Sequence, residues 1–436
     1  MSDQAAHARQ TDRQMHDRTH SSKRLTGEIP PAFRSTGRDA RIDVCRGIAL
    51  WWIFLDHVPD NAASWLTLRN YGFCDAAEIF MFISGVTCAL AYGRARQRDG
   101  WTGMVGRSLR RGWDIYAAFL LLVLACAVLV DVSGNDRLAD ESNMRVLFER
   151  PGATLAQAAI LQFHPVNTDV LPVFVICHVL FAPLLWLLLR APNATLGVSL
   201  SLYALVHVFG WRVAAWPGGV WFFNPLAWQF LVVLGAWYVI EGKTIRGWVT
   251  SRSALVVSAF VLAISLVLAL GQHVKLPVPQ ALTDLLFPLD KSNLSPLRLL
   301  HFLAVAIVAS WLVPADWRGL STPMLRGARR CGENSLPIYG LGVLLALVSQ
   351  LDLFDVANRL AMQIALSLVG VLLMTAVATL LSALGTGRKP AAGAVGREIS
   401  VAATNRKAGV RAGSTASGRE PTAVTAPSNL TPLMKI

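Results

Sequence analysis

The stretch CRGIALWWIFLDHVP, from Cys45 to Pro59, decides the fold class because it is a long apolar run with charged groups near both ends. Arg46 stands at its start, and Asp56 and His57 stand near its finish. About 20 apolar residues in a helix span the roughly 30 Å hydrocarbon core of a bilayer. The stretch therefore predicts a membrane-spanning helix over 42–60.

The rest of the chain repeats this pattern. Of its 436 residues, 54% are hydrophobic and 15% are charged, and the mean hydropathy is +0.46. A soluble chain of this length carries far more charge on its surface. We predict an all-α polytopic membrane protein with about ten transmembrane helices, near 42–60, 75–93, 113–131, 169–189, 194–212, 222–240, 252–271, 296–314, 335–352 and 360–384.

Lys and Arg set the expected orientation, because short loops rich in these residues stay in the cytoplasm. Counted over alternate loops, Lys and Arg predict an integral membrane domain over 42–384 with both termini in the cytoplasm. The flanking segments 1–41 and 385–436 are basic, polar and without apolar periodicity, which predicts disordered tails. Because the net charge of +13 is dispersed along tails and loops, we expect anionic lipid and not nucleic acid as its partner.

The first helix places two ionisable residues on one face. His57 follows Arg46 by eleven residues, which is about 1100° of helical rotation and about 16 Å along the axis. Ionisable residues inside a span commonly mark a site, and histidine suits the work of a general base. Two interpretations stay open: His57 is catalytic, with Asp56 tuning it, or Arg46 snorkels to lipid headgroups and Asp56, His57 and Pro59 merely end the helix.

The second helix begins with DAAEIFMFISG, residues 75–85, and carries Asp75 and Glu78 one turn apart. In the expected topology both acids lie near the outer end, close in depth to His57. Glu78 then either orients and charge-stabilises His57, or both acids cap the helix N-terminus and favour its dipole. Ser84 and Gly85 present a small face that favours close helix packing.

The stretch GRSLRRGW, residues 106–113, places Arg107 and Arg110 three residues apart on one face of a cytoplasmic helix start. Arginine forks suit phosphate groups, and Arg46 lies at similar depth. An anionic cytosolic donor is the expected ligand, although membrane topology alone also explains many such arginines.

A third group comes from DKSNLSPLRLLHFLA, residues 290–304. Arg298 and His301 share a helix face near the outer end, and Lys291 and Asn293 precede them in the loop. We expect this group to recognise a sugar or the carboxylate of a dicarboxylic acyl group; the alternative is an interfacial arginine and a packed histidine.

Other reactive side chains carry no such pattern. The six cysteines are scattered without a C-x-x-C pair, so neither a disulfide nor a metal site is expected, and we interpret them as inert buried thiols. His178 and His207 lie in apolar spans without a motif and are interpreted as structural.

These motifs together resemble the membrane-bound acyltransferase 3 superfamily, through Arg46 and His57 followed by FMFISG at 80–85 and the Arg107 and Arg110 pair. RGIALWWIFLDHVP (46–59), LTLRNYGFCDAAEIFMFISG (66–85), NPLAWQFLVVLGAW (224–237) and DKSNLSPLRLLHFLA are similar to the OpgC family, the succinyl-modifying proteins of osmoregulated periplasmic glucans. The similarity spreads from about residue 41 to about residue 345 and leaves both tails outside.

The resemblance implies a transmembrane acyltransferase with an acyltransferase-3-like bundle in the bacterial inner membrane. It would move an acyl group, expected to be succinyl, from cytosolic acyl-CoA to hydroxyls of a periplasmic glucan. His57 would be the catalytic histidine, and Arg46, Arg107 and Arg110 would hold the CoA phosphates or the thioester. Acyl-CoA would be a cosubstrate, with no tightly bound cofactor and no metal; the oligomeric state stays open.

Two other classes of function stay in view. A proton-coupled polytopic transporter of an anionic small molecule or sugar also carries intramembrane carboxylates and a proton-carrying histidine. A structural or signalling membrane protein would leave these inward-facing charges dispensable. Transfer of label from acyl-CoA into a glucan ester distinguishes an enzyme from both.

Overall fold

The computed structural model describes residues 33, 39–274, 289–314, 317–355 and 360–387, and these residues are helical with no named strand. Of the predicted tails at 1–41 and 385–436, the structure describes residues 33, 39–41 and 385–387, and the rest lie outside the described residues. The main helices are α3 (Ala40–His57), α4 (Ala76–Ser133), α8 (Val170–Arg190), α9 (Pro192–Phe209), α10 (Pro225–Val249), α11 (Arg252–Val274), α13 (Pro296–Leu312), α14 (Pro323–Glu333), α15 (Ser335–Asp355) and α16 (Leu360–Gly387).

Shorter elements connect these helices. They are η1 (Ala62–Leu66), η2 (Leu68–Asn70), α5 (Asp136–Glu141), α6 (Arg145–Glu149), α7 (Pro151–Ala159) and η3 (Arg318–Ser321). Contacts group the chain through Ser382 into one compact unit, and the residues from Ala383 onward form a second unit of which only the end of α16 is described.

Each of the ten predicted segments falls on a helix, but two of them share one. The segments expected at 75–93 and 113–131 are the two limbs of α4, which stays helical between them except at Gly100. Gly100 takes φ 70° and ψ −162°, a conformation open to glycine because it lacks a Cβ. The connection predicted there as a loop is therefore a kink in a long helix.

Ten membrane spans are not confirmed. By length and composition, six described helices qualify as spans, and α4 counts as one of them. The number rises to seven if α14 and α15, which are bent by 100° at their junction, form one broken span. α13 has 17 residues and is a shorter apolar helix. α3 is absent from the six because its 18 residues include Arg41, Asp43, Arg46 and Asp56.

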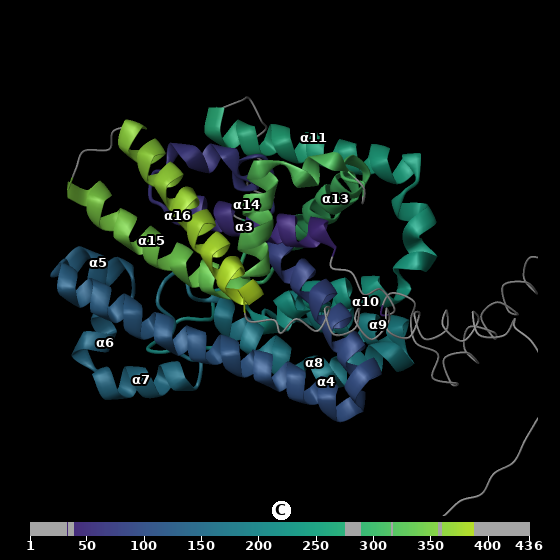
Figure 1. The fold of residues 1–436 in the computed structure, drawn as a ribbon, viewed down its shortest axis with the longest axis horizontal. Helices are drawn as coiled ribbons and strands as arrows, with labels where there is room; N and C mark the ends of the chain where they lie inside the picture. Colours follow the sequence, from purple (N-terminus) through teal and green to yellow (C-terminus); the bar gives the residue numbers. More distant parts are fainter. Residues whose placement is uncertain (1–32, 34–38, 275–288, 315–316, 356–359, 388–436) are drawn as a thin grey trace, which may run out of the picture. The chain divides into compact units, whose positions relative to one another are not determined.

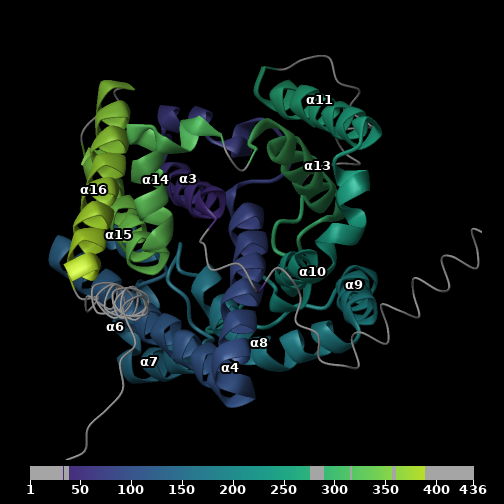
Figure 2. The same ribbon diagram turned by 45° about the vertical axis from the view of Figure 1, so that its right-hand side comes forward.

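The core of this unit forms where α3 packs against α14 and where α4 packs against α10 and α8. Figures 1 and 2 show α14 beside α3 and the first limb of α4 near α10. Gly85 of α4 faces the Val232 carbonyl, and Gly235 of α10 faces the Phe82 carbonyl, each without room for a Cβ. Gly85, one of the two residues of the predicted small face, thus packs against the backbone of α10, as membrane helix pairs favour.

Glycine at position 47 is required for the contact between α3 and α14. A Cβ on Gly47 would overlap the carbonyl of Ala328. Because that carbonyl belongs to the backbone, no side-chain rotation can relieve the overlap. We expect Gly47→Ala to destabilise the fold by at least the about 1–3 kcal/mol typical of overpacked cores. Gly197→Ala is the matched control, because nothing lies within 4 Å of a Cβ at that position of α9. Thermal unfolding in detergent measures both; equal melting temperatures would contradict the packing described.

Candidate functional site

His57 is the last residue of α3 and is half-buried. Its Nδ1 lies 2.5 Å from the carbonyl oxygen of Ile53. Because a carbonyl only accepts, Nδ1 must carry the proton, and in the neutral ring Nε2 is then the basic nitrogen. The last turn of α3 therefore fixes the tautomer that a general base needs.

Asp56 is tied to the loop that follows α3. Its carboxylate accepts a hydrogen bond from Thr67 Oγ1 at 2.7 Å, and its carbonyl accepts one from Arg69 Nη1 at 3.2 Å. These bonds hold η1 and η2 against the end of the helix. The hydrogen bond from Thr67 to its carboxylate thus anchors the loop and not the imidazole, which supports the helix-ending interpretation of Asp56.

Glu78 and Asp75 form a capping box at the start of α4. Asp75 accepts from the backbone of Ala77, and Glu78 accepts from the backbone N–H of Asp75 at 2.9 Å. Glu78 is fully buried and accepts from Arg298 Nε at 2.6 Å. The capping interpretation of the two acids is therefore what the structure shows, and the charged partner of Glu78 is an arginine of α13.

The predicted acceptor group gathers around this capping box. Arg298 also bonds Asp75 at 3.1 Å, and Lys291 Nζ lies 2.6 Å from the same carboxylate. Two cations thus neutralise two buried acids, which otherwise would be costly in a low-dielectric interior. Lys291 is the more accessible of the two cations, with 29% of its side chain exposed.

Asn293 and His301 are bound internally as well. Asn293 Oδ1 accepts from Asn224 Nδ2 at 2.8 Å, and its own Nδ2 donates to Asp290 at 2.7 Å. His301 Nδ1 accepts from the backbone N–H of Cys74 at 3.3 Å. Lys291, Arg298 and His301 therefore join α13 and the loop before it to the start of α4, whereas Asn293 joins that loop to Asn224, the N-cap residue of α10.

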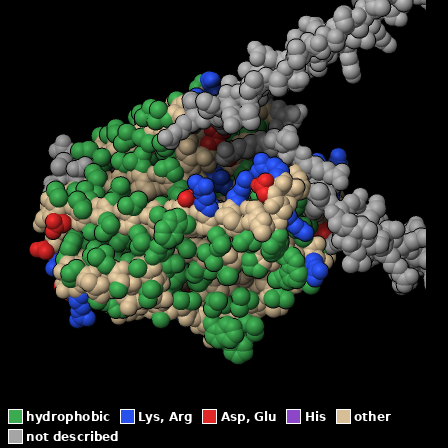
Figure 3. All heavy atoms as spheres, turned by 60° about the horizontal axis from the view of Figure 1, so that its bottom comes forward, with side chains coloured by type: hydrophobic (Ala, Val, Ile, Leu, Met, Phe, Trp, Pro, Cys, Tyr) green, Lys and Arg blue, Asp and Glu red, His purple; other side chains and the backbone are tan. Residues whose placement is uncertain are grey.

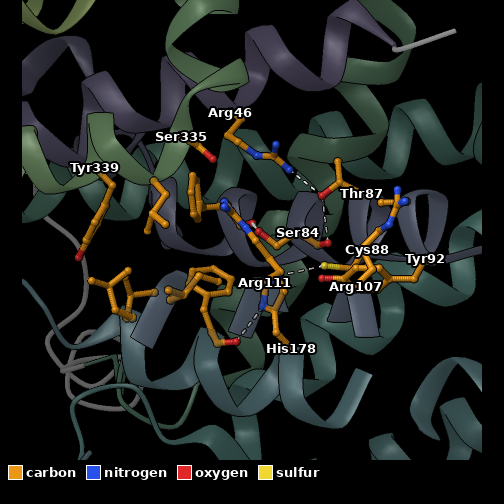
Figure 4. A pocket seen from close by; sticks show the side chains of 17 residues that line it. Arg46, Ser84, Thr87, Cys88, Tyr92, Arg107, Arg111, His178, Ser335 and Tyr339 are labelled. Carbon is orange, nitrogen blue, oxygen red and sulfur yellow. Dashed lines mark hydrogen bonds between the residues drawn. The ribbon is translucent and has the colours of Figure 1, made fainter. Parts of the chain in front are cut away.

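Two of the three predicted donor arginines, Arg46 and Arg107, lie elsewhere and line a cavity of about 290 Å³ between α3, α4, α8 and α15. Arg46 is 9% exposed, and its Nη2 donates to Thr87 Oγ1 at 2.6 Å. Figure 4 shows Arg46, Arg107 and Arg111 around this space. Its polar lining comprises Arg46, Ser84, Thr87, Cys88, Tyr92, Arg107, Arg111, His178, Ser335 and Tyr339.

Arg111, and not Arg110, lines the cavity with Arg107. Arg110 is exposed on α4. The buried positions Ser108 and Gly112 mark the inward face of this limb, and Arg111 flanks that face. The i, i+3 pairing of arginines in the sequence selected Arg110, whereas the i, i+4 spacing of the small residues Ser108 and Gly112 was the signal for the inward face.

His178 and Cys88 also line the cavity, although neither belongs to a sequence motif. His178 Nε2 lies 3.4 Å from Cys88 Sγ. An ionisable ring in an otherwise apolar span was the one sequence signal for this position.

In the space-filling view, Lys and Arg side chains gather in a hollow of a mostly apolar face (Figure 3).

Apolar helices long enough to cross a membrane, packed around a cavity with three arginines, define a polytopic helical membrane protein with a basic internal site. A family model described as OpgC protein matches residues 38–385, so the chain belongs to the OpgC protein family. That membership indicates a membrane-associated, glucan-modifying acyltransferase. Comparison with curated proteins and with solved structures found no match, and the acyltransferase-3-like bundle stays a prediction.

Proposed function

We propose that this protein is a transmembrane O-acyltransferase that moves a succinyl group from cytosolic acyl-CoA to hydroxyls of a periplasmic glucan. Family membership supports the reaction class. The observation that carries the proposal is the placement of Arg46 and His57 on α3, with Arg46 in a cavity that two more arginines share. One helix thus connects a site for an anionic donor with a base.

The donor is recognised at the cavity. A CoA thioester brings phosphate groups and a thioester carbonyl, and guanidinium groups bind both through charged hydrogen bonds. Arg107 and Arg111 lie one helical turn apart on α4, and Arg46 faces them from α3. Arg107 also lies 3.7 Å from Asp99, a weak exposed pair that an incoming phosphate displaces at little cost.

His57 acts on the acceptor. Its Nε2 takes the proton from a glucan hydroxyl as the oxygen attacks the acyl carbonyl, and Nδ1 stays bonded to the Ile53 carbonyl. In the bacterial inner membrane, with both termini in the cytoplasm, the end of α3 lies on the periplasmic side. The base then meets the glucan, and the arginines face the cytosolic donor.

The group around Asp75 and Glu78 receives the acceptor or the free carboxylate of the acyl group. Lys291 is suited to this role because it is the more accessible cation there and its ammonium lies 5.6 Å from the ring centre of Phe222. An aromatic surface beside a cation and amide groups is a common way to bind sugar. Arg298 and His301, being buried, hold the position of the loop that carries Lys291.

The test is direct transfer by the purified protein. With labelled succinyl-CoA and a periplasmic glucan, we expect label to appear in the glucan as an alkali-labile ester. Vesicle uptake of label without covalent transfer would instead favour the proton-coupled transporter. Glucan that stays unlabelled while the protein is folded would reject the acyltransferase assignment.

Arg111→Gln is expected to raise the KM for acyl-CoA by at least about tenfold, because a hydrogen bond to a charged group contributes about 1.5–3 kcal/mol. Arg110→Gln is the paired comparison one position away, and we expect a smaller effect because Arg110 is exposed beside the cavity lining and not part of it. Steady-state kinetics over a range of acyl-CoA concentrations measures both. A larger rise in the KM for acyl-CoA with Arg110→Gln than with Arg111→Gln would contradict this assignment and favour Arg107 and Arg110 as the donor-binding pair.

A further inference from the structure

The loop between α3 and α4, residues 58–75, displays two aromatic side chains that have no role yet in the function proposed above. Trp65 and Tyr71 each expose 40% of their surface. Their rings are in contact, with centroids 6.3 Å apart and planes inclined by 76°. Exposed apolar surface that is gathered in one place commonly marks a binding site. We call this pair of rings the aromatic corner.

The aromatic corner has the shape and chemistry that a sugar ring fits. The Tyr71 hydroxyl donates to the Trp65 carbonyl at 2.6 Å, which fixes the two residues relative to each other. The face of an aromatic ring carries partial negative charge and attracts C–H groups. A pyranose ring presents C–H groups on its faces and hydroxyls around its edge. Two aromatic rings at nearly a right angle can therefore contact one sugar ring on two sides.

The loop that carries the aromatic corner is held at three points. Near its start, Asn61 Oδ1 accepts from Ser367 Oγ of α16 at 2.9 Å. In its middle, Thr67 is bonded to the end of α3, as described above. Near its finish, Gly72 lies so close to the His301 ring of α13 that a Cβ would overlap it. A surface fixed in this way loses little conformational entropy when a ligand binds.

These anchors place the loop across the end of α3. Figures 1 and 2 show α16 and α13 on either side of α3, and α3 itself packs against α14, α15 and α4. Aromatic residues that anchor a protein in lipid headgroups belong to the rim of a bundle, at the membrane interface. A loop that crosses the end of a packed helix is better placed for a ligand from the aqueous side.

Polar groups accompany the aromatic corner. Arg69 is exposed between the two rings in the chain, and a guanidinium has five N–H donors. Its Nη1 donates to the Asp56 carbonyl, and the remaining donors suit sugar hydroxyls. The same loop ends at Asp75, whose carboxylate pairs with Lys291. The loop thus runs from the end of α3 at His57 to the group already proposed to receive the acceptor.

We propose that the aromatic corner is a carbohydrate subsite, where Trp65 and Tyr71 hold a sugar ring of the glucan next to the ring whose hydroxyl reacts at His57. The proposal rests on the proposed function and deepens it, because it assigns acceptor recognition to the loop after α3. Trp65 and Tyr71 bind the glucan and take no part in the movement of protons.

Binding without chemistry tests the subsite. The full chain in detergent is dialysed to equilibrium against radiolabelled, unsubstituted glucan from cells that lack the protein, with no acyl-CoA present. We expect Trp65→Ala to weaken glucan binding by at least about fivefold, as loss of an aromatic stacking contact does. Trp65→Phe keeps an aromatic face and should bind within about twofold of the wild type.

Trp248→Ala is the matched control. Trp248 is 65% exposed and lies in the last turn of α10, whereas the first turn of α10 lies beside the loop before α13. We expect this variant to bind glucan like the wild type. Equal losses with Trp65→Ala and Trp248→Ala would show a general effect of removing exposed tryptophan and would overturn the proposal.

Steady-state kinetics separates a subsite from a lipid anchor. In the subsite, Trp65→Ala raises the KM for glucan by at least about fivefold and leaves the KM for acyl-CoA unchanged. A lipid anchor would instead lower the melting temperature or kcat without changing the affinity for glucan. That second pattern, with Trp65→Phe no better than Trp65→Ala, would contradict the proposal.

Footprinting of the wild type decides if Trp65→Ala does not reach the wild-type melting temperature. Hydroxyl radicals oxidise exposed aromatic side chains, and peptide mass analysis locates the oxidation. We expect bound glucan to protect Trp65 and Tyr71 but not Trp248. Oxidation of Trp65 and Tyr71 that glucan leaves unchanged would overturn the proposal.

The outcomes distinguish this proposal from the proposed function. If the wild type acylates glucan and a folded Trp65→Ala protein binds glucan as tightly, the subsite is rejected and the acyltransferase stands. If the wild type binds glucan through Trp65 but transfers no label from succinyl-CoA, the subsite stands and the acyltransferase is rejected. A wild type that neither binds nor acylates glucan rejects both.

Discussion

Replacing His57 by alanine is expected to lower acyl transfer by about 10²–10⁴-fold, the contribution of a positioned general base, while the protein stays folded. The ring is half-buried at the end of α3, and its anchoring bond runs to the carbonyl of Ile53 within the same helix. Removing the ring therefore breaks a hydrogen bond within α3 and leaves the contact of Gly47 with α14 in place. Glucan ester content and the melting temperature are the two readouts.

His207→Ala is the matched control for this variant. His207 lies in α9, and its ring packs 4.6 Å from the ring of Tyr203, away from the cavity lining. We expect its transfer rate to stay at the wild-type level. Undiminished glucan modification by a folded His57→Ala protein would remove His57 as the base.

Replacing Arg298 by methionine is expected to destabilise the fold by about 3–5 kcal/mol, the cost of leaving a buried charge without its partner. Arg298 bonds both Glu78 and Asp75, and Glu78 has no exposed surface. The loss should appear as a lower unfolding midpoint in detergent. A second substitution, Glu78→Gln, should restore part of the stability by removing the charge left behind.

An exposed ion pair supplies the comparison for Arg298. Arg145 pairs with Asp140 on the surface of the segment between α4 and α8, where solvent screens the attraction. Arg145→Met is expected to leave the unfolding midpoint near that of the wild type. An Arg298→Met protein that melts like Arg145→Met would show that the buried cluster does not hold α13 against α4.

The helices were predictable from hydropathy because each predicted segment is a long run of mostly apolar residues. Their connections were less so. The expected loop between 93 and 113 is helical because its six arginines are good helix formers, and of its four glycines only Gly100 departs from helical dihedral angles. Fewer than ten described helices qualify as spans because two predicted segments share α4, α3 carries four charged residues, α13 is short, and α15 qualifies only together with α14.

The candidate site was predictable where chemistry and spacing agree. Arg46 and Arg107 were selected from the sequence, and both line the cavity. Arg111, which joins them, was missed because the arginines were paired by their own spacing and not by the small residues Ser108 and Gly112 that mark the inward face. The partner of Glu78 was also missed: Arg298 lies 220 residues away in the chain, so only the packing of α13 on α4 brings them together.

The pairing of Cys88 and His178 was hidden for the same reason. The residues are 90 positions apart on different helices, and neither stands in a motif. Only the fold places a thiol against an imidazole nitrogen. Scattered cysteines therefore looked alike in the sequence, although one of them faces a cationic cavity.

The central claim, that this protein attaches an acyl group to a periplasmic glucan, is tested most directly by the mass of glucans isolated from cells with and without it. We predict that glucans from cells with the protein carry mass increments of one succinyl group each, and that these increments vanish without the protein or with His57→Ala. Identical glucan masses in the presence and absence of the protein would contradict the account.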